Sequence, residues 1–305
     1  MRDKKIEQII GTTPLVKLRR LVNPDMAEVW VKLESHNPAG SVKDRPALYM
    51  LNAAEEAGLL PPGGTIIEST SGNTGVALAM LAAARGYRMI LVMPETMSVE
   101  RRKLAQAYGA EIILTPGAAG MQGAVDKARE LVAQHGYFMP DQFANQNNVR
   151  AHYETTGVEI LRDLDKSPDA LVAGVGTGGT ISGAGRRLKE NNSSTLIVAV
   201  EPENSPLLSG GNAGSHKIQG LGANFIPPIL DRSIIDQVIT VKDEDAFATA
   251  QKLASQEGIL CGISAGANVF AALQLAQKLG TSKTVVTIVP DTGERYLSTP
   301  LYSGE

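Results

Sequence analysis

Residues 169–180 read Asp-Ala-Leu-Val-Ala-Gly-Val-Gly-Thr-Gly-Gly-Thr, a short apolar run that leads into a glycine-rich loop. The residues that follow, up to position 191, have the composition of a helix. A strand, a tight loop and a helix in this order form the repeating unit of proteins in which helices cover a parallel sheet. This stretch therefore predicts an α/β fold.

The same alternation recurs along the chain. Strands are expected at residues 29–33, 65–68, 89–93, 111–114, 169–173, 196–200, 238–241 and 284–289. Helices are expected at residues 42–57, 74–85, 98–108, 121–134, 149–164, 180–191, 242–257 and 265–279. Short strands that alternate with longer helices favour twisted, mostly parallel sheets flanked by helices.

Length and composition narrow the classes of function. The chain has 305 residues, 43% of them hydrophobic and 20% charged, which is enough for two domains with cores of their own. A net charge of -3 argues against nucleic acid as a partner. No apolar stretch is long enough to span a membrane, and no apolar signal segment follows the N-terminus.

Cysteine and histidine usage indicates the compartment of the protein and argues against a metal site. The single cysteine, Cys261, cannot form an internal disulfide, which fits a reducing cytosol, and burial is favoured over a reactive thiol. The four histidines show no metal-ligand spacing. We therefore expect a cytoplasmic protein without a metal site.

Two segments interrupt the alternation. The polar residues 141–148 separate two strand–helix series, and we place a domain junction there. Residues 203–232 are rich in Gly, Pro and Asn and are too many for a plain connector. Irregular loops of this length in compact domains are often functional.

Lys43 follows a loop that contains Pro38 and Gly40, and a stretch with helical character begins directly after it. A lysine amine can form a Schiff base with pyridoxal phosphate, provided that the chain also supplies a pocket for the phosphate. A lone lysine is more often a solvated surface charge, so the other motifs must decide.

Residues 69–75, Ser-Thr-Ser-Gly-Asn-Thr-Gly, lie between an expected strand and an expected helix. Hydroxyl groups, an amide and free backbone N–H groups at a helix N-terminus suit a carboxylate or a phosphate. Capping of the helix by Ser71 or Asn73 would need only one such residue, so we favour an anion site.

The loop at residues 174–180 can wrap a phosphate with its backbone, and Thr177 and Thr180 add hydroxyl groups. It also matches the pattern G-x-G-x-x-G, and Glu201 ends the next strand roughly 20 residues on, as in dinucleotide sites. A nicotinamide-dependent oxidoreductase is therefore a rival on these residues alone.

A third loop, residues 262–267, again precedes an expected helix. Ser264 could cap that helix, or it could face the ring nitrogen of a cofactor. A further glycine-containing loop, residues 220–224, lies in the long irregular segment.

Together these loops resemble one family. Six runs occur in the order and spacing of the fold-type II pyridoxal phosphate enzymes, at residues 37–45, 70–75, 176–180, 220–225, 262–266 and 291–302. More narrowly, the chain resembles the cysteine synthase (O-acetylserine sulfhydrylase) and cystathionine β-synthase family, as do residues 10–16 and 293–302. The resemblance covers essentially the whole chain and makes the NAD-dependent oxidoreductase a remote alternative.

The resemblance implies a role for each loop. Lys43 would be the catalytic Schiff-base lysine, Asn73 would bind the phenolic oxygen of pyridoxal 5'-phosphate, and Ser264 would meet its pyridine nitrogen. The phosphate cradle would be Gly176, Thr177, Gly178, Gly179 and Thr180. The substrate would be bound by Thr70, Ser71, Gly72, Thr74, Gln142 and Gly220.

It also implies two domains, each with a twisted, mostly parallel sheet flanked by helices, as in the tryptophan synthase β-like fold. Residues 44–148 would form a smaller, mobile domain that binds the substrate carboxylate. Residues 1–43 and 149–305 would form a larger domain that binds the cofactor phosphate. The active site would lie in the cleft between them.

The implied reaction is a β-replacement. O-acetyl-L-serine would lose acetate to give an α-aminoacrylate, and sulfide would add to give L-cysteine. Several residues lean toward cystathionine β-synthase, at positions 37–40, 44, 225–227, 230–232, 260–262 and 264–266. Asn224 stands where cysteine synthases commonly have Gly. The alternative is therefore a condensation of serine or O-acetylserine with homocysteine.

The resemblance also implies two protein partners. The chain would form a homodimer, and its active-site cleft could take the C-terminal tail of serine acetyltransferase.

Overall fold

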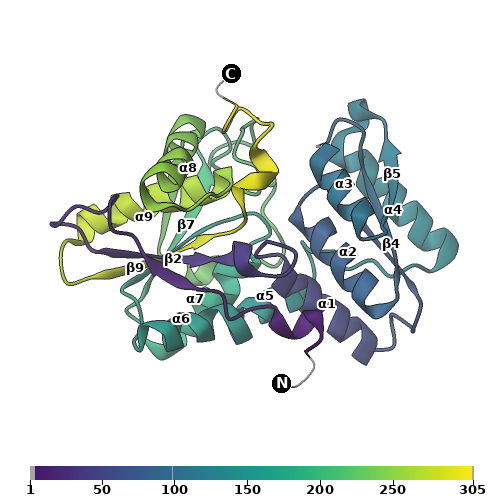
Figure 1. Ribbon diagram of the computed structural model, residues 1–305, viewed down its shortest axis with the longest axis horizontal. Coiled ribbons are helices and arrows are strands. Elements are labelled where there is room, and N and C mark those ends of the chain that lie inside the picture. The colour runs from purple at the N-terminus through teal and green to yellow at the C-terminus, as the bar shows by residue number, and fades with distance from the viewer. Residues whose placement is uncertain (1–3, 98, 304–305) are drawn as a thin grey trace. The chain divides into compact units, whose positions relative to one another are not determined.

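A computed structural model describes residues 4–97 and 99–303, which form two compact units (Figure 1). Unit 1 comprises residues 4–10 and 43–148, apart from position 98, and unit 2 comprises residues 11–42 and 149–303. We expected residues 4–10 in the larger domain, but they group with unit 1, where Glu7 pairs with Arg85. Each unit has a sheet of its own, so the expected α/β class is confirmed.

Unit 1 is built on a three-stranded parallel sheet in the order β3–β4–β5. Its strands are β3 (Thr65–Ser69), β4 (Arg88–Pro94) and β5 (Glu111–Thr115). Its helices are α1 (Asp44–Glu56), α2 (Asn73–Arg85), α3 (Val99–Ala107) and α4 (Gly120–His135). The side chains of Ile67, Ile90 and Val92 form a core with Ala124 and Ala128, whose small size lets α4 approach the sheet closely.

Unit 2 is built on a six-stranded sheet in the order β1–β2–β9–β6–β7–β8, in which β1 alone runs antiparallel. Its strands are β1 (Leu15–Lys17), β2 (Glu28–Leu33), β6 (Ala170–Gly174), β7 (Leu196–Pro202), β8 (Gln237–Val241) and β9 (Thr284–Val289). Its principal helices are α6 (Gly157–Leu164), α7 (Gly179–Asn191), α8 (Asp243–Glu257) and α9 (Ile263–Leu279).

The central strands of unit 2 are buried on both faces. On β6, Val172 belongs to the core that contains residues of α8 and α9, whereas Leu171 belongs to the core that contains residues of α6 and α7. On β7, Val198 and Ile197 divide between the same two cores. A strand that is covered on both faces reads as a continuous apolar run, which is the pattern in the sequence.

The expected helix at residues 149–164 is interrupted. The helix α5 (Gln146–Ala151) ends before a π-helical turn, His152–Thr156, and α6 follows. His152 is buried, and within this turn its Nδ1 lies 2.9 Å from the hydroxyl of Thr156. Such turns are frequent at functional sites. The expected helix at 98–108 begins at Ser98, which lies outside the described residues.

The parallel strands place two of the loops that the sequence singles out. The loop at residues 69–75 follows the carboxyl end of β3, and the loop at 174–180 follows that of β6. Ligands of open parallel sheets bind at the carboxyl ends of the strands. The long segment at 203–232 follows β7 and contains no helix or strand before η5 (Arg232–Ile234) begins, as expected.

Candidate cofactor and substrate sites

The loop between β6 and α7 in unit 2 forms a cradle at a helix N-terminus. Gly178 precedes α7 with a φ of 84°, a left-handed conformation that favours glycine. Thr177 is buried, and its Oγ1 accepts a 3.4 Å hydrogen bond from the backbone of Gly179. The first N–H groups of a helix have no partner within it, so the start of this 13-residue helix favours an anion.

Glycines bring this cradle against the irregular segment. A Cβ on Gly176 would lie 2.3 Å from the carbonyl oxygen of Gly220, so the two backbones are in contact only because Gly176 has no side chain. A Cβ on Gly220 would in turn lie 3.6 Å from Oγ of Ser264. The cradle, Gly220 and Ser264 are therefore gathered in one region of unit 2.

Ser264 does not occupy the capping position of its helix. The N-cap of α9 is Gly262, and Ser264 is the second residue of the helix. Its side chain is buried, with an exposed fraction of 4%. Ser264 therefore does not cap its helix, and its hydroxyl lies beside the cradle instead.

His152 is a polar neighbour of the cradle that the sequence reasoning missed. Its Nε2 lies 3.2 Å from Oγ1 of Thr180, and its Nδ1 lies 2.9 Å from Oγ1 of Thr156. A buried histidine with both ring nitrogens engaged orients the groups that it touches. The sequence around His152 carries no signal for this contact, because only the fold brings Thr180 near it.

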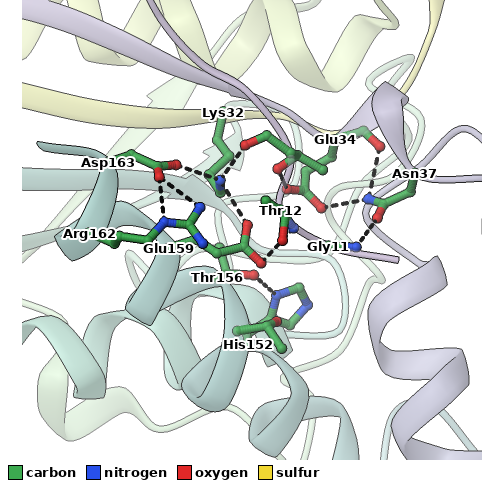
Figure 2. A network of polar contacts seen from close by, with 12 residues as sticks. Gly11, Thr12, Lys32, Glu34, Asn37, His152, Thr156, Glu159, Arg162 and Asp163 are labelled. Carbon is green, nitrogen blue, oxygen red and sulfur yellow. Dashed lines mark hydrogen bonds and ion pairs between the residues drawn. The ribbon is translucent and has the colours of Figure 1, made fainter. Parts of the chain in front are cut away.

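A buried ionic network anchors the chain that leads to the candidate lysine loop (Figure 2). Lys32 is fully buried, donates to the carbonyl of Thr13 at 2.7 Å and pairs with Glu159 at 2.9 Å. Glu159 also accepts a 2.9 Å hydrogen bond from the backbone of Thr12, whose φ is 49°. The network therefore fixes residues 12 and 13 against α6.

Asn37, the first residue of the lysine loop, belongs to a second set of these contacts (Figure 2). Its Oδ1 accepts a 2.8 Å hydrogen bond from the backbone of Gly11, and its Nδ2 donates to Glu34 at 2.9 Å. Further along the loop, the backbone N–H of Val42 donates to the carbonyl of Pro290 at 2.8 Å. The segment before Lys43 is thus held at both ends.

Lys43 itself immediately precedes α1 and is half-buried. Its carbonyl accepts a 3.0 Å hydrogen bond from the backbone of Ala47 in the first turn of that helix. Val42 belongs to unit 2 and Lys43 to unit 1, so the chain passes from one unit to the other at this residue.

The loop between β3 and α2 gathers several predicted residues in unit 1. The N-cap position is Gly72, which has no side chain, so Ser71 and Asn73 do not fill it. The backbone N–H of Gly72 donates to Oγ1 of Thr70 at 3.2 Å. Their neighbour Thr74 is almost completely buried.

Thr74 and Gln142 come from distant parts of the chain. The hydroxyl of Thr74 donates a 2.6 Å hydrogen bond to Oε1 of Gln142, across 68 residues of sequence. The carbonyl of Gln142 accepts a 2.8 Å hydrogen bond from Asn148. The residues predicted for the substrate carboxylate therefore lie together at the start of α2.

Glu68 is a second polar residue that the sequence reasoning missed. It ends the apolar part of β3, its exposed fraction is 3%, and its Oε1 accepts a 3.2 Å hydrogen bond from the backbone of Ser69. Burial, followed by the charge of Asp141, raises the pKa of Glu68 to about 8. A carboxylate inside an apolar strand was the available signal.

Glu201 has a different role from the one that a dinucleotide site requires. Its oxygens accept hydrogen bonds from the backbone of Leu208 at 2.7 Å and from the backbone and hydroxyl of Ser209 at 2.9 and 2.6 Å. The carboxylate therefore organises the start of the irregular segment, and its acceptor capacity is used there.

Other chemistries find little support in the described residues. Among residues 4–97 and 99–303, no group of three or more His, Cys, Asp or Glu side chains could hold a metal ion. Across the same residues, no helix is both long enough and apolar enough to cross a bilayer. Cys261 is buried, and burial raises the pKa of its thiol, so it is a poor nucleophile.

Known proteins resemble this chain along nearly its whole length. A family model described as pyridoxal-phosphate dependent enzyme matches residues 6–291. A cysteine synthase of Staphylococcus aureus is 56% identical over 299 residues, which cover 98% of this chain and 96% of that protein.

Solved structures agree with these matches. An O-ureido-L-serine synthase, 48% identical, has a TM-score of 0.96 and covers 99% of this chain and 96% of its own. A cysteine synthase of Entamoeba histolytica, 43% identical, has a TM-score of 0.96 and covers 99% of this chain and 91% of its own. The resemblance inferred from the sequence is confirmed, and the chain belongs to the pyridoxal-phosphate-dependent enzymes, among the cysteine synthases.

Proposed function

We propose that the chain makes L-cysteine and acetate from O-acetyl-L-serine and sulfide, with pyridoxal phosphate as its cofactor. The observation that carries this proposal is the identity of 56% with a cysteine synthase over 98% of the chain. The geometry adds two loops at helix N-termini, one in each unit, that suit the phosphate of the cofactor and the carboxylate of the substrate.

The residues of unit 2 fit the cofactor. The loop from Gly176 to Thr180 offers backbone N–H groups, the hydroxyls of Thr177 and Thr180, and a helix N-terminus. A side chain on Gly176 would fill this cradle, and the hydroxyl of Ser264 lies nearby as a neutral partner for the ring nitrogen. When bound, pyridoxal phosphate withdraws electrons from Cα of an amino acid and so eases loss of its proton and of the β-substituent.

We assign two tasks to Lys43. Its Nζ would hold the cofactor in the resting enzyme, with Asn73 as the partner of the phenolic oxygen. Once the donor's amino group has replaced it, the same amine would take the proton from Cα and later return it. A base held beside the reacting carbon can reach an effective molarity on the order of 10⁵ M or more.

The remaining predicted residues would orient the donor. The start of α2, with Thr70 to Thr74 and Gln142, would hold the α-carboxylate, and Gly220 would approach the amino and side-chain region. We propose that residues 44–148 form a mobile domain that closes over the donor and shields the reaction from water.

A second acceptor is supported by one specific observation. Asn224, which stands where cysteine synthases commonly have Gly, has a φ of 63°, and its Oδ1 accepts a 2.9 Å hydrogen bond from Ser205. A fixed polar side chain in this loop would change the space available to an incoming thiol. Condensation with homocysteine is therefore the alternative.

Pure enzyme assayed with each pair of donor and acceptor separates the two. O-acetyl-L-serine and L-serine would each be combined with sulfide and with homocysteine. We expect the highest kcat/KM for O-acetyl-L-serine with sulfide. A higher kcat/KM for homocysteine would establish the alternative instead.

We also propose a cytoplasmic homodimer, which could bind the C-terminal tail of a serine acetyltransferase. The family resemblance supports both partners. Light scattering of the purified protein would test the dimer, and a tail peptide that competes with O-acetyl-L-serine would test the second partner.

A further inference from the structure

Glu68 connects the two segments that bring the proposed carboxylate-binding residues together. Its Oε1 accepts a 3.2 Å hydrogen bond from Ser69, where the loop at 69–75 begins. On the other side, the backbone N–H groups of Asp141 and Gln142 lie close enough to lower its pKa. Gln142 then receives the hydroxyl of Thr74 at 2.6 Å. Glu68 therefore supports both halves of this site.

The surroundings of Glu68 disfavour a negative charge. The side chain is almost completely buried, and its Oε2 has no hydrogen-bond partner among the described residues. The charged group that faces it is Asp141, while its neighbour across the strand ladder on β4 is Leu91. The first turn of α2 carries no acidic side chain. Burial and one like charge thus act on an unpaired oxygen.

We propose that Glu68 is a positioning residue whose neutral form is required for tight binding of the donor's carboxylate, so that its ionisation weakens binding at alkaline pH. This inference rests on the proposed function, which places a substrate carboxylate at Thr70, Thr74 and Gln142. An ionised Glu68 would put a second negative charge behind that anion. It would also pull on the backbone of Gln142, whose side chain meets Thr74.

The pH range follows from the environment of the group. Because burial and Asp141 raise the pKa of Glu68 to about 8, the side chain is mostly neutral at pH 7 and ionises above pH 8. Loss of one required proton raises an apparent KM about tenfold per pH unit once the pKa is passed. Proton transfer at Cα is assigned to Lys43, so kcat has no part in this effect.

The test compares wild-type holoenzyme with Glu68→Gln, in which a neutral side chain of the same shape replaces the carboxyl group. KM is measured from about pH 6.5 to about pH 9.5, a range that covers the titration of Glu68 on both sides of its pKa. We expect similar KM values for O-acetyl-L-serine at pH 7. Above pH 8 the ratio of wild-type to variant KM should grow about tenfold per unit, at unchanged relative kcat. Titrations of Lys43 and of the donor's amino group are common to both proteins and cancel in this ratio.

Two further proteins make the test specific. Glu111→Gln carries the same substitution at an exposed position of β5 and should follow the wild type at every pH. Asp141→Asn removes the neighbouring charge at a φ of 51° that asparagine tolerates. Because the charge of Asp141 opposes ionisation of Glu68, the KM of this variant should begin to rise at a lower pH than that of the wild type. This second variant keeps the inference testable if Glu68→Gln does not fold.

The outcomes are distinguishable from failure of the proposed reaction. The dissociation constant of L-serine, measured by calorimetry without an acceptor over the same pH range, reports binding of the carboxylate without formation of a product. A ratio of wild-type to variant constants that stays level with pH would overturn the inference, as would an unmoved onset in Asp141→Asn. Absence of L-cysteine formation at every pH, with the serine ratio rising as expected, would refute the reaction alone.

Discussion

The hydroxyl of Thr74 donates a 2.6 Å hydrogen bond to Oε1 of Gln142, and both side chains are buried within unit 1. With Oε1 engaged, the Nε2 end of the amide is the one that can donate to an anion. A residue 68 positions away thus completes the anion-binding end of α2.

Replacing Gln142 by Ala should therefore impair donor binding more than the fold. A hydrogen bond to a charged group is worth about 1.5–3 kcal/mol, so we expect KM for O-acetyl-L-serine to rise by roughly 10- to 150-fold. Steady-state kinetics would measure this. Gln134→Ala, which removes an exposed glutamine of α4, is the control and should leave KM unchanged. Equal effects of both variants would contradict the assignment.

The glycine at position 178 should be required for cofactor binding. Ala at a left-handed position costs about 1–2 kcal/mol, and a Cβ on Gly178 would lie 2.9 Å from Cβ of Leu230. Gly210 has a similar φ of 88°, but a Cβ there would have no neighbour within 4 Å. We expect both Ala variants to lose stability, while only Gly178→Ala weakens pyridoxal phosphate binding, by tenfold or more.

Titration of the released cofactor by fluorescence or absorbance would give both dissociation constants. If Gly210→Ala lost the cofactor as readily as Gly178→Ala, backbone strain alone would account for the effect, and the loop would not be the phosphate cradle.

The pKa of Glu68 also makes stability depend on pH. Its folded-state pKa of about 8 lies above the ordinary value of 4.5, so the folded protein binds the proton more tightly than the unfolded chain. The resulting stability is fully present below about pH 4.5 and is lost as pH rises to about 8. The total is on the order of a few kcal/mol.

Glu68→Gln should remove this dependence. Chemical denaturation at pH 6 and pH 9 would show a smaller loss of unfolding free energy in the variant than in the wild type. Identical losses in the two proteins would mean that Glu68 does not titrate in this range.

The buried pair of Lys32 and Glu159 should matter more than an exposed pair. Lys32→Ala would leave the carboxylate of Glu159 buried without its cation and should cost about 3–5 kcal/mol of unfolding free energy. Lys17 pairs with Glu28 at the exposed end of the same sheet, and Lys17→Ala should cost about 1 kcal/mol or less. Thermal or chemical unfolding would compare them, and similar losses would contradict the difference.

The main elements could be predicted because their signals are local. The run at 284–289 follows an expected helix and contains only residues that fit a buried strand. The observed strand β9 spans the same residues, Thr284–Val289. The edge strand β1 was missed because three residues carry no periodic pattern and gain their conformation from pairing, as Val16 does with Val31. The π turn at His152–Thr156 was missed because no residue in this stretch breaks the helical pattern of the sequence.

The candidate site could likewise be predicted only in part from the sequence. Glycine loops are visible in sequence because tight turns and helix N-termini restrict the residues near them. Glu68 and His152 were not found, since their importance comes from partners such as Asp141 and Thr180 that only the fold brings near. The roles assigned to the loop residues stay predictions until the variants are measured.

The most direct measurement concerns Lys43. Reduction of the holoenzyme with borohydride fixes a lysine-bound cofactor permanently, and mass spectrometry of the digested protein then identifies the lysine. We predict that the phosphopyridoxyl group is found on Lys43 and that Lys43→Ala shows neither the label nor L-cysteine formation. A label on a different lysine, or full activity of the Ala variant, would contradict the assignment of Lys43 as the catalytic residue.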